Sequence, residues 1–106
     1  MTEIFRRIEM ERKAQDKKWG KQNHSPIEWS VILTEECGEV AKEALEHRFG
    51  IDPRAASGLT EVAAERRALF RYEEELIQVA AVAVAMIESL WRNELRASYY
   101  KKPKPL

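Results

Sequence analysis

The chain has 106 residues, of which 34% are charged, and its 18 Lys and Arg balance its 18 Asp and Glu. This length favours a single domain, and the zero net charge argues against general affinity for nucleic acid or an anionic membrane surface. The first residues mix both charge signs, and the longest apolar run, residues 79–87, is too short to cross a bilayer. We therefore expect a cytoplasmic protein with neither nucleic acid nor membrane as a partner.

Helix-forming residues dominate the sequence, because Ala, Glu, Leu and Arg are frequent while Pro and Gly are few. Apolar residues at helical spacing mark a first helix near the N-terminus, with Thr2 as its candidate N-cap and an end at about Lys17. No segment shows the alternating pattern of a half-buried strand. The sequence therefore predicts an all-α fold.

The clearest helix start lies at Pro26. Ser25 precedes it as a candidate N-cap, and Glu28 stands where it completes a capping box. This second helix should end near Phe49, because Gly50 can take the left-handed conformation that terminates helices. Residues 51–60 are expected to be a connection.

From Glu61 to Tyr100 no Gly or Pro interrupts the helix formers, which predicts one long helix or two that break near Arg71; we favour one, with a kink allowed. The stretch from Leu76 to Trp91 is apolar on nearly every face, so other helices must surround it. Three main helices in one chain cannot do so easily. We therefore expect a homo-oligomer, a dimer or a tetramer, that completes a four-helix-type bundle.

Residues 1–98 are assigned to this single helical domain, and the basic, proline-containing residues 99–106 to a flexible tail. Cys37 is the only cysteine, so it cannot form an internal disulfide, and we interpret it as a small buried apolar residue. Trp29 and Trp91 are interpreted as core or interface residues.

The second helix carries a stripe of acidic residues. At about 100° per residue, five side chains fall within roughly one quadrant of the helix: Glu35, Glu36, Glu39, Glu43 and Glu46. We expect four small or apolar residues to point the opposite way: Leu33, Cys37, Val40 and Ala44. Like charges at this spacing destabilise a helix unless something positive faces them. That could be basic side chains along a solvated face, which the Glu-rich composition makes a serious alternative, or a metal ion.

A second polar group favours the metal ion. Glu75 and Gln78 share one helical face at the mouth of the apolar stretch, where an unpaired carboxylate is costly. Carboxylates and an amide carbonyl form the oxygen set that Mg²⁺ or Mn²⁺ prefers. The chain lacks the Cys and His cluster of a structural zinc site and the Glu-x-x-His pairs of a di-iron bundle.

Two segments together resemble a known family. EECGEV at residues 35–40, followed by ELIQVAAVAVA at residues 75–85, resembles the MazG-like all-α nucleoside-triphosphate pyrophosphohydrolases. ERKAQDKKWGKQNHS at residues 11–25 resembles the segment that precedes the first motif in short, phage-type or bacterial members. The resemblance spans about residues 9–90. It implies hydrolysis of a nucleoside triphosphate between the α and β phosphates, with Mg²⁺ as cofactor.

Carried onto this chain, the resemblance implies that Glu36, Glu39 and Glu75 are metal ligands. Glu35 would be a further ligand or the base that orients the attacking water. The fourth acid of the family falls on Gln78, which can still offer a neutral oxygen but removes one negative charge. This departure favours a site that needs more Mg²⁺ or prefers Mn²⁺.

Substrate contacts are expected from the end of the first helix. Lys17 and Lys18 could meet the outer phosphates and Trp19 could stack on the base, although the lysines could instead complement the helix dipole and Trp19 could simply pack. Arg71, one turn before Glu75, could contact a phosphate; a salt bridge to the acidic stripe is the interpretation we favour.

These observations predict a house-cleaning (d)NTP pyrophosphohydrolase that releases a nucleoside monophosphate and pyrophosphate. The alternative is a non-catalytic helical oligomer that senses nucleotide or binds a protein partner, in which Gln78 marks a decayed site. His24 and Gln22 are weaker candidates for substrate contacts.

Overall fold

The computed structural model describes the backbone of residues 1–50 and 60–95, and it describes the side chains of these residues up to Asn93. Three long α-helices are present, α1 (Thr2–Trp19), α2 (Pro26–Phe49) and α3 (Glu61–Leu90), and one π-helical turn, η1 (Trp91–Leu95), follows α3. No strand occurs in these two ranges, which confirms the predicted all-α class. The predicted tail and all of the predicted connection except Thr60 lie outside the described residues.

Side-chain caps start the two longest helices. Ser25 Oγ accepts a hydrogen bond from the Glu28 backbone N–H at 3.2 Å, and Glu28 Oε1 accepts one from the Ser25 N–H at 2.9 Å, so the predicted capping box is confirmed. Thr60 Oγ1 caps α3 in a similar way, at 3.1 Å from the backbone nitrogen three residues later. Each such cap stabilises its helix by about 1 kcal/mol. The prediction that Thr2 caps the first helix was wrong, because α1 already includes Thr2 and has no side-chain cap.

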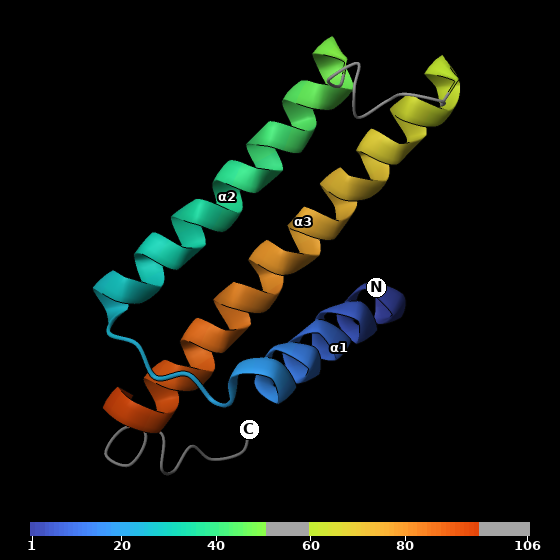
Figure 1. Ribbon diagram of the computed structural model, residues 1–106. Coiled ribbons are helices and arrows are strands. Elements are labelled where there is room, and N and C mark those ends of the chain that lie inside the picture. The colour runs from blue at the N-terminus through green and yellow to red at the C-terminus, as the bar shows by residue number, and fades with distance from the viewer. Residues whose placement is uncertain (51–59, 96–106) are drawn as a thin grey trace.

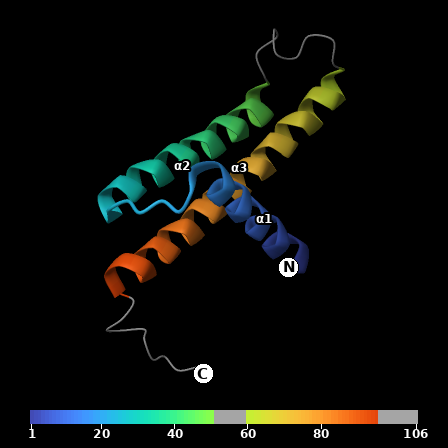
Figure 2. The ribbon, with the colours of Figure 1, turned by 60° about the horizontal axis from the view of Figure 1, so that its bottom comes forward.

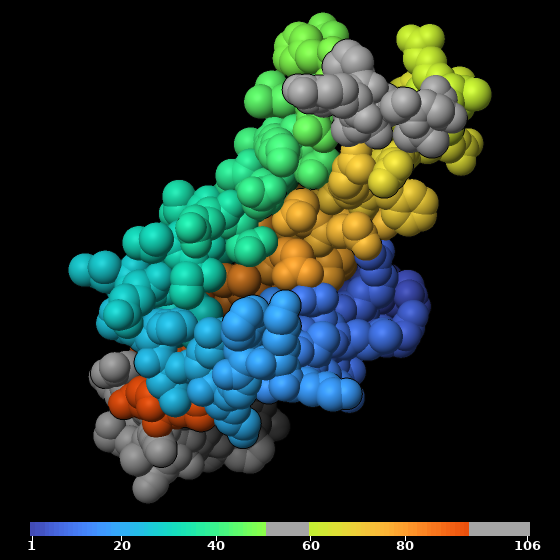
Figure 3. Space-filling model, in the orientation of Figure 1, coloured from blue at the N-terminus to red at the C-terminus, as the bar shows by residue number. Residues whose placement is uncertain are grey.

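The helices form an antiparallel pair with a third helix across it. α2 and α3 lie side by side, and α1 lies against the half of α3 nearer its C-terminus (Figure 1). Seen from another side, α1 crosses α3 at an angle rather than running along it (Figure 2). In the space-filling view α1 covers only the lower part of the α2–α3 pair (Figure 3). α3 passes Arg71 without a break, so the expected single long helix is confirmed.

Charged side chains attach α1 to α3. Arg12 is buried, and its Nη2 lies 2.6 Å from Oε1 of Glu88 on α3. A second, more exposed pair joins Arg7 to Glu73 at 3.1 Å. A buried guanidinium is tolerated only when its donors are satisfied, and Arg12 also donates to Asp16 at 2.9 Å. These interactions place α1 against α3.

A small apolar core lies between α2 and α3. Trp29 is 5% exposed and packs with Val82 and Ala85, which confirms its predicted place in the core. Ala68 and Ala81 are fully buried, and small side chains at such positions let helices approach closely. Several large apolar residues of α3 stay exposed in the single chain, among them Val84, Ile87 and Leu90.

The inner face of α2 differs from the predicted one. Glu36 is partly buried and Glu43 is buried, on the same side of the helix as Trp29 and Val40. Four residues turn a helix by only about 40° beyond one full turn, so Val40 lies beside Glu36 and not opposite to it. Cys37 is exposed, which corrects the interpretation of this residue as buried. The acidic stripe therefore borders the core.

Candidate metal and nucleotide site

One ion pair shows how α2 and α3 are aligned. Arg71 Nε lies 3.3 Å from Glu43 Oε1, across the two antiparallel helices. Seven residues correspond to about two helical turns. Two turns back along α2 from Glu43 lead to Glu36, and two turns forward along α3 from Arg71 lead to Gln78. Because the helices are antiparallel, Glu36 and Gln78 lie at the same level. Predicted ligands from two helices therefore face one another.

One helical turn from the same ion pair, back along α2 and forward along α3, brings Glu39 level with Glu75. Burial raises the pKa of Glu75, and the carboxylates of Glu36 and Glu39 raise it further. Burial likewise raises the pKa of Glu36, and Glu39, Glu35 and Glu11 add to that shift. These carboxylates repel one another across the helix pair, so a cation between them would relieve the repulsion.

The acidic stripe divides into two parts. Glu43 and Glu46 face Arg71, at 3.3 Å and 3.9 Å, so the favoured salt bridge of Arg71 is confirmed and this half is neutralised by a basic side chain. The other three acids of the stripe, Glu35, Glu36 and Glu39, form no ion pair with any residue that the structure describes, and neither does Glu75 on α3. The need for a positive partner therefore remains at the half of the stripe that faces Glu75.

A cavity of about 450 Å³ opens between the three helices at Glu36, whereas the predicted ligands Glu39 and Glu75 do not line it. Five residues that the sequence analysis proposed for the site line it: Lys18 and Trp19 from α1, the weaker candidate Gln22, Glu36 from α2 and Gln78 from α3. Lys18 Nζ lies 4.8 Å from the centre of the Trp19 ring, a cation–π distance. The structure thus gathers a cation, an aromatic ring, a carboxylate and an amide around one space.

Other predicted site residues lie outside this cavity. Lys17 and Glu35 are exposed and do not line it. Lys17 belongs to the last turn of α1, where a cation complements the helix dipole. Arg71 lies about two turns from Gln78 and is engaged by Glu43 and Glu46.

Two residues of α1 at the cavity were missed by the sequence analysis. Glu11 lines it, and Gln15 Nε2 donates a hydrogen bond to Gln78 Oε1 at 3.4 Å. Their spacing to Lys18 places all three on one face of α1. The spacing of these residues could have been recognised in the sequence. Only the packing of α1 in the structure shows that this face of α1 meets Glu36 and Gln78.

The donor set suits a hard cation, although the side chains do not converge on one point. In residues 1–50 and 60–95, no group of three or more His, Cys, Asp or Glu is placed to hold a metal ion. Three observations still fit Mg²⁺ or Mn²⁺: all donors are oxygens, the pKa values of Glu36 and Glu75 are raised, and no basic residue of the described part of the chain pairs with these carboxylates.

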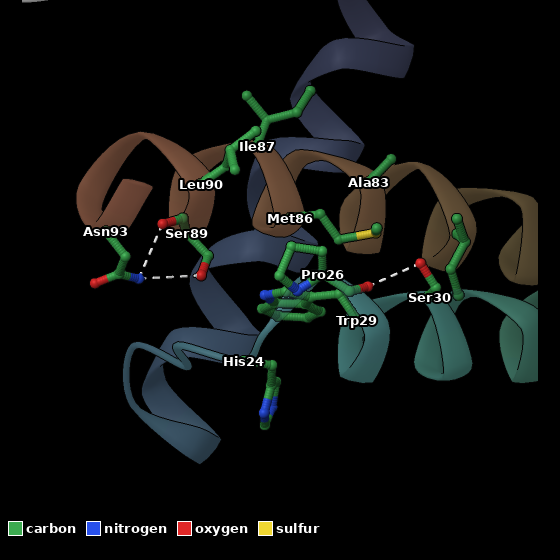
Figure 4. Close-up of a pocket in the computed structure, with 11 residues that line it drawn as sticks. His24, Pro26, Trp29, Ser30, Ala83, Met86, Ile87, Ser89, Leu90 and Asn93 are labelled. Carbon is green, nitrogen blue, oxygen red and sulfur yellow. Dashed lines mark hydrogen bonds between the residues drawn. The ribbon is translucent and has the colours of Figure 1, made fainter. Parts of the chain in front are cut away.

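A second, apolar cavity of about 340 Å³ is also lined by Trp29 (Figure 4). The centres of the His24 and Trp29 rings lie 4.8 Å apart in an edge-to-face arrangement. Met86 lies above the Trp29 ring in this view. Asn93 Nδ2 donates to the Ser89 carbonyl at 2.9 Å at one end of the cavity. The indole N–H of Trp29 finds no acceptor among the described residues. Trp29 lines both cavities, so it separates a polar space from an apolar one.

Comparisons with protein-family models, with curated proteins and with solved structures found no match to this chain. None of the helices in the described ranges has a stretch apolar enough to span a lipid bilayer. The chemistry of the polar cavity is therefore the basis for assigning a function.

Proposed function

We propose that the protein is a metal-dependent (d)NTP pyrophosphohydrolase that converts a nucleoside triphosphate and water into a monophosphate and pyrophosphate, in a house-cleaning role. The observation that carries this proposal is the polar cavity, where the unneutralised carboxylate of Glu36 shares one space with Lys18 and Trp19. The sequence resemblance to MazG-like pyrophosphohydrolases supports the same reaction.

Mg²⁺ is the proposed cofactor, with Mn²⁺ as a substitute. The carboxylates of Glu36, Glu39 and Glu75 and the carbonyl of Gln78 would hold it between α2 and α3. When bound, the ion neutralises the charge that develops on the phosphate oxygens. Glu35 lies next to Glu36 and is exposed, so it can reach a water molecule and accept its proton.

The end of α1 supplies the substrate contacts in this proposal. Lys18 reaches the cavity and would pair with the outer phosphates, with Lys17 as a second cation nearby. Trp19 is 60% exposed, which leaves its ring accessible for a base to stack on. Arg71 is engaged by Glu43, and its proposed part is to align α2 with α3 rather than to bind phosphate.

We propose that copies of the chain associate as a dimer or tetramer through the apolar face of α3. Light scattering of the wild-type protein should then give a multiple of the 12.3 kDa chain mass. Ile87→Asp should lower this mass, because a charge in a buried apolar interface is costly. Ile4→Asp is a matched control, since Ile4 on α1 and Ile87 are both 48% exposed. A monomeric wild-type protein would refute the association.

The alternative function, a non-catalytic oligomer that senses nucleotide or binds a protein, has one observation in its favour. Gln78 stands where the family resemblance places an acid, which lowers the negative charge at the cavity. Such a protein would bind a nucleotide without cleaving it, and a ligand at a hundred times its Kd would stabilise the fold by about 2.7 kcal/mol.

A panel of ribo- and deoxynucleoside triphosphates, incubated with Mg²⁺ and separately with Mn²⁺, tests the proposal. Ion-exchange chromatography should show a monophosphate and pyrophosphate from at least one substrate, and no signal without the metal. Release of a diphosphate and phosphate would contradict the proposed bond. Thermal stabilisation by a nucleotide without any turnover would support the sensing function instead.

A further inference from the structure

A chain of hydrogen bonds runs from α1 to the polar cavity and ends at Gln78. Arg12 Nη1 donates to Gln15 Oε1 at 2.9 Å. Gln15 Nε2 then donates to Gln78 Oε1 at 3.4 Å. Arg12 itself is buried and is held on the other side by Glu88 of α3, at 2.6 Å.

The chemistry of these groups leaves one orientation for both amides. An arginine side chain only donates hydrogen bonds, so Gln15 must turn its oxygen toward Arg12 and its NH₂ group away. That NH₂ group also only donates, so Gln78 must turn its oxygen toward Gln15. The direction of the Gln78 amide thus follows from a guanidinium two hydrogen bonds away.

From this geometry we propose that Gln15 is a positioning residue that keeps the oxygen of Gln78, and not its nitrogen, available to a cation. A carbonyl oxygen has two lone pairs, so a hydrogen bond from Gln15 leaves one lone pair for the ion. This inference rests on the proposed function, because it takes Gln78 as a cation ligand.

An amide at position 78 creates the need for such a positioning residue. The two oxygens of a carboxylate are equivalent, so a glutamate there would present an oxygen however it rotated. Gln78 presents either an oxygen or an NH₂ group, and only the oxygen attracts a cation. Side chains that orient metal ligands typically change affinity by about 10- to 100-fold.

A double-mutant cycle in cation binding tests the inference. Mn²⁺ affinity would be measured by electron paramagnetic resonance, and Mg²⁺ affinity by calorimetry, without nucleotide, for the wild type, Gln15→Leu, Gln78→Glu and the double variant. Gln15→Leu should weaken binding by about 10-fold or more in the wild-type background. In the Gln78→Glu background the same change should alter affinity by less than about two-fold, because no amide remains to be oriented.

Two control variants separate positioning from simple packing. Gln22→Leu makes the same chemical change at another residue that lines the cavity, and it should leave cation affinity unchanged. Gln15→Met keeps the length of the side chain, and it replaces Gln15→Leu if the leucine variant loses helicity. All of these variants keep Arg12 and Glu88, but both Gln15 variants also remove the acceptor of Arg12 Nη1, and the double-mutant cycle cancels that effect because it is present in both backgrounds.

The outcomes are distinct. An equal loss of affinity in both backgrounds would show that Gln15 only docks α1, and unchanged affinity in Gln15→Leu would also overturn the inference. Nucleotide turnover with either result would leave the proposed function standing. Cation binding that follows the expected cycle, without turnover, would refute the hydrolysis alone. A wild-type protein that binds neither cation would refute both.

Discussion

Glu36→Gln should reduce turnover of nucleoside triphosphate by at least on the order of 100-fold, the loss typical when one charge-stabilising group is removed from an active site. Glu75→Gln should act similarly from the facing helix. Glu46→Gln is the matched control: it removes a charge from the same stripe, but from a side chain that faces Arg71. Steady-state kinetics at saturating Mg²⁺ would measure the three variants, and full activity of Glu36→Gln would refute the assigned site.

Glu36→Gln should also raise the melting temperature of the metal-free protein at neutral pH. Burial and nearby carboxylates raise the pKa of Glu36 in the folded state, so its ionised form opposes folding. Stability from such a group is present below its unfolded pKa and is lost as pH rises through the folded value. The advantage of glutamine should therefore disappear below the ordinary value of 4.5. A variant that melts lower than the wild type at neutral pH would contradict this account.

Trp29→Ala should lower the free energy of unfolding by about 3–5 kcal/mol, the usual cost of emptying the space of a large buried aromatic residue. Trp29 is 5% exposed and packs on Val82 and Ala85, between the two cavities. Domains are typically stable by only about 5–15 kcal/mol, so the variant should be close to unfolding at physiological temperature. Denaturant titration followed by circular dichroism measures the loss.

Two further tryptophan variants are controls for the stability loss expected of Trp29→Ala. Trp29→Phe should cost much less than Trp29→Ala, because it keeps an aromatic ring and the lost indole N–H has no acceptor in the described part of the chain. Trp19→Ala should stay within about 1 kcal/mol of the wild type, since Trp19 is 60% exposed. Equal losses for alanine at both positions would show that the core between α2 and α3 does not depend on Trp29.

Local signals predicted the helices well. The capping box of Ser25 and Glu28 and the glycine at position 50 are short-range features, and the structure has α2 between them, Pro26–Phe49. Such signals depend only on neighbouring residues, so no knowledge of packing was needed. Thr2 shows their limit, because a residue with a good capping side chain was included in α1 itself.

Features of the site that depend on packing were harder to predict. The wrong placement of Val40 opposite the acidic stripe was an error of helical geometry and not of packing, because only about 40° separates it from Glu36; both residues are partly buried. Which acids are neutralised depends on the alignment of the two helices, and that alignment places Arg71 beside Glu43. The hydrogen bond from Gln15 to Gln78 could not be predicted, because the two residues lie 63 positions apart in the chain.

The attachment of α1 through charged side chains has a consequence for how the protein would lose its site. Lys18 and Trp19 belong to α1, whereas the core of Trp29, Val82 and Ala85 belongs to the other two helices. Segments held by few buried apolar contacts open at a lower free-energy cost than the whole domain. Detachment of α1 would therefore remove Lys18 and Trp19 from the polar cavity while α2 and α3 stay packed against each other. The proposed site should then be lost under milder conditions than those that unfold the whole domain.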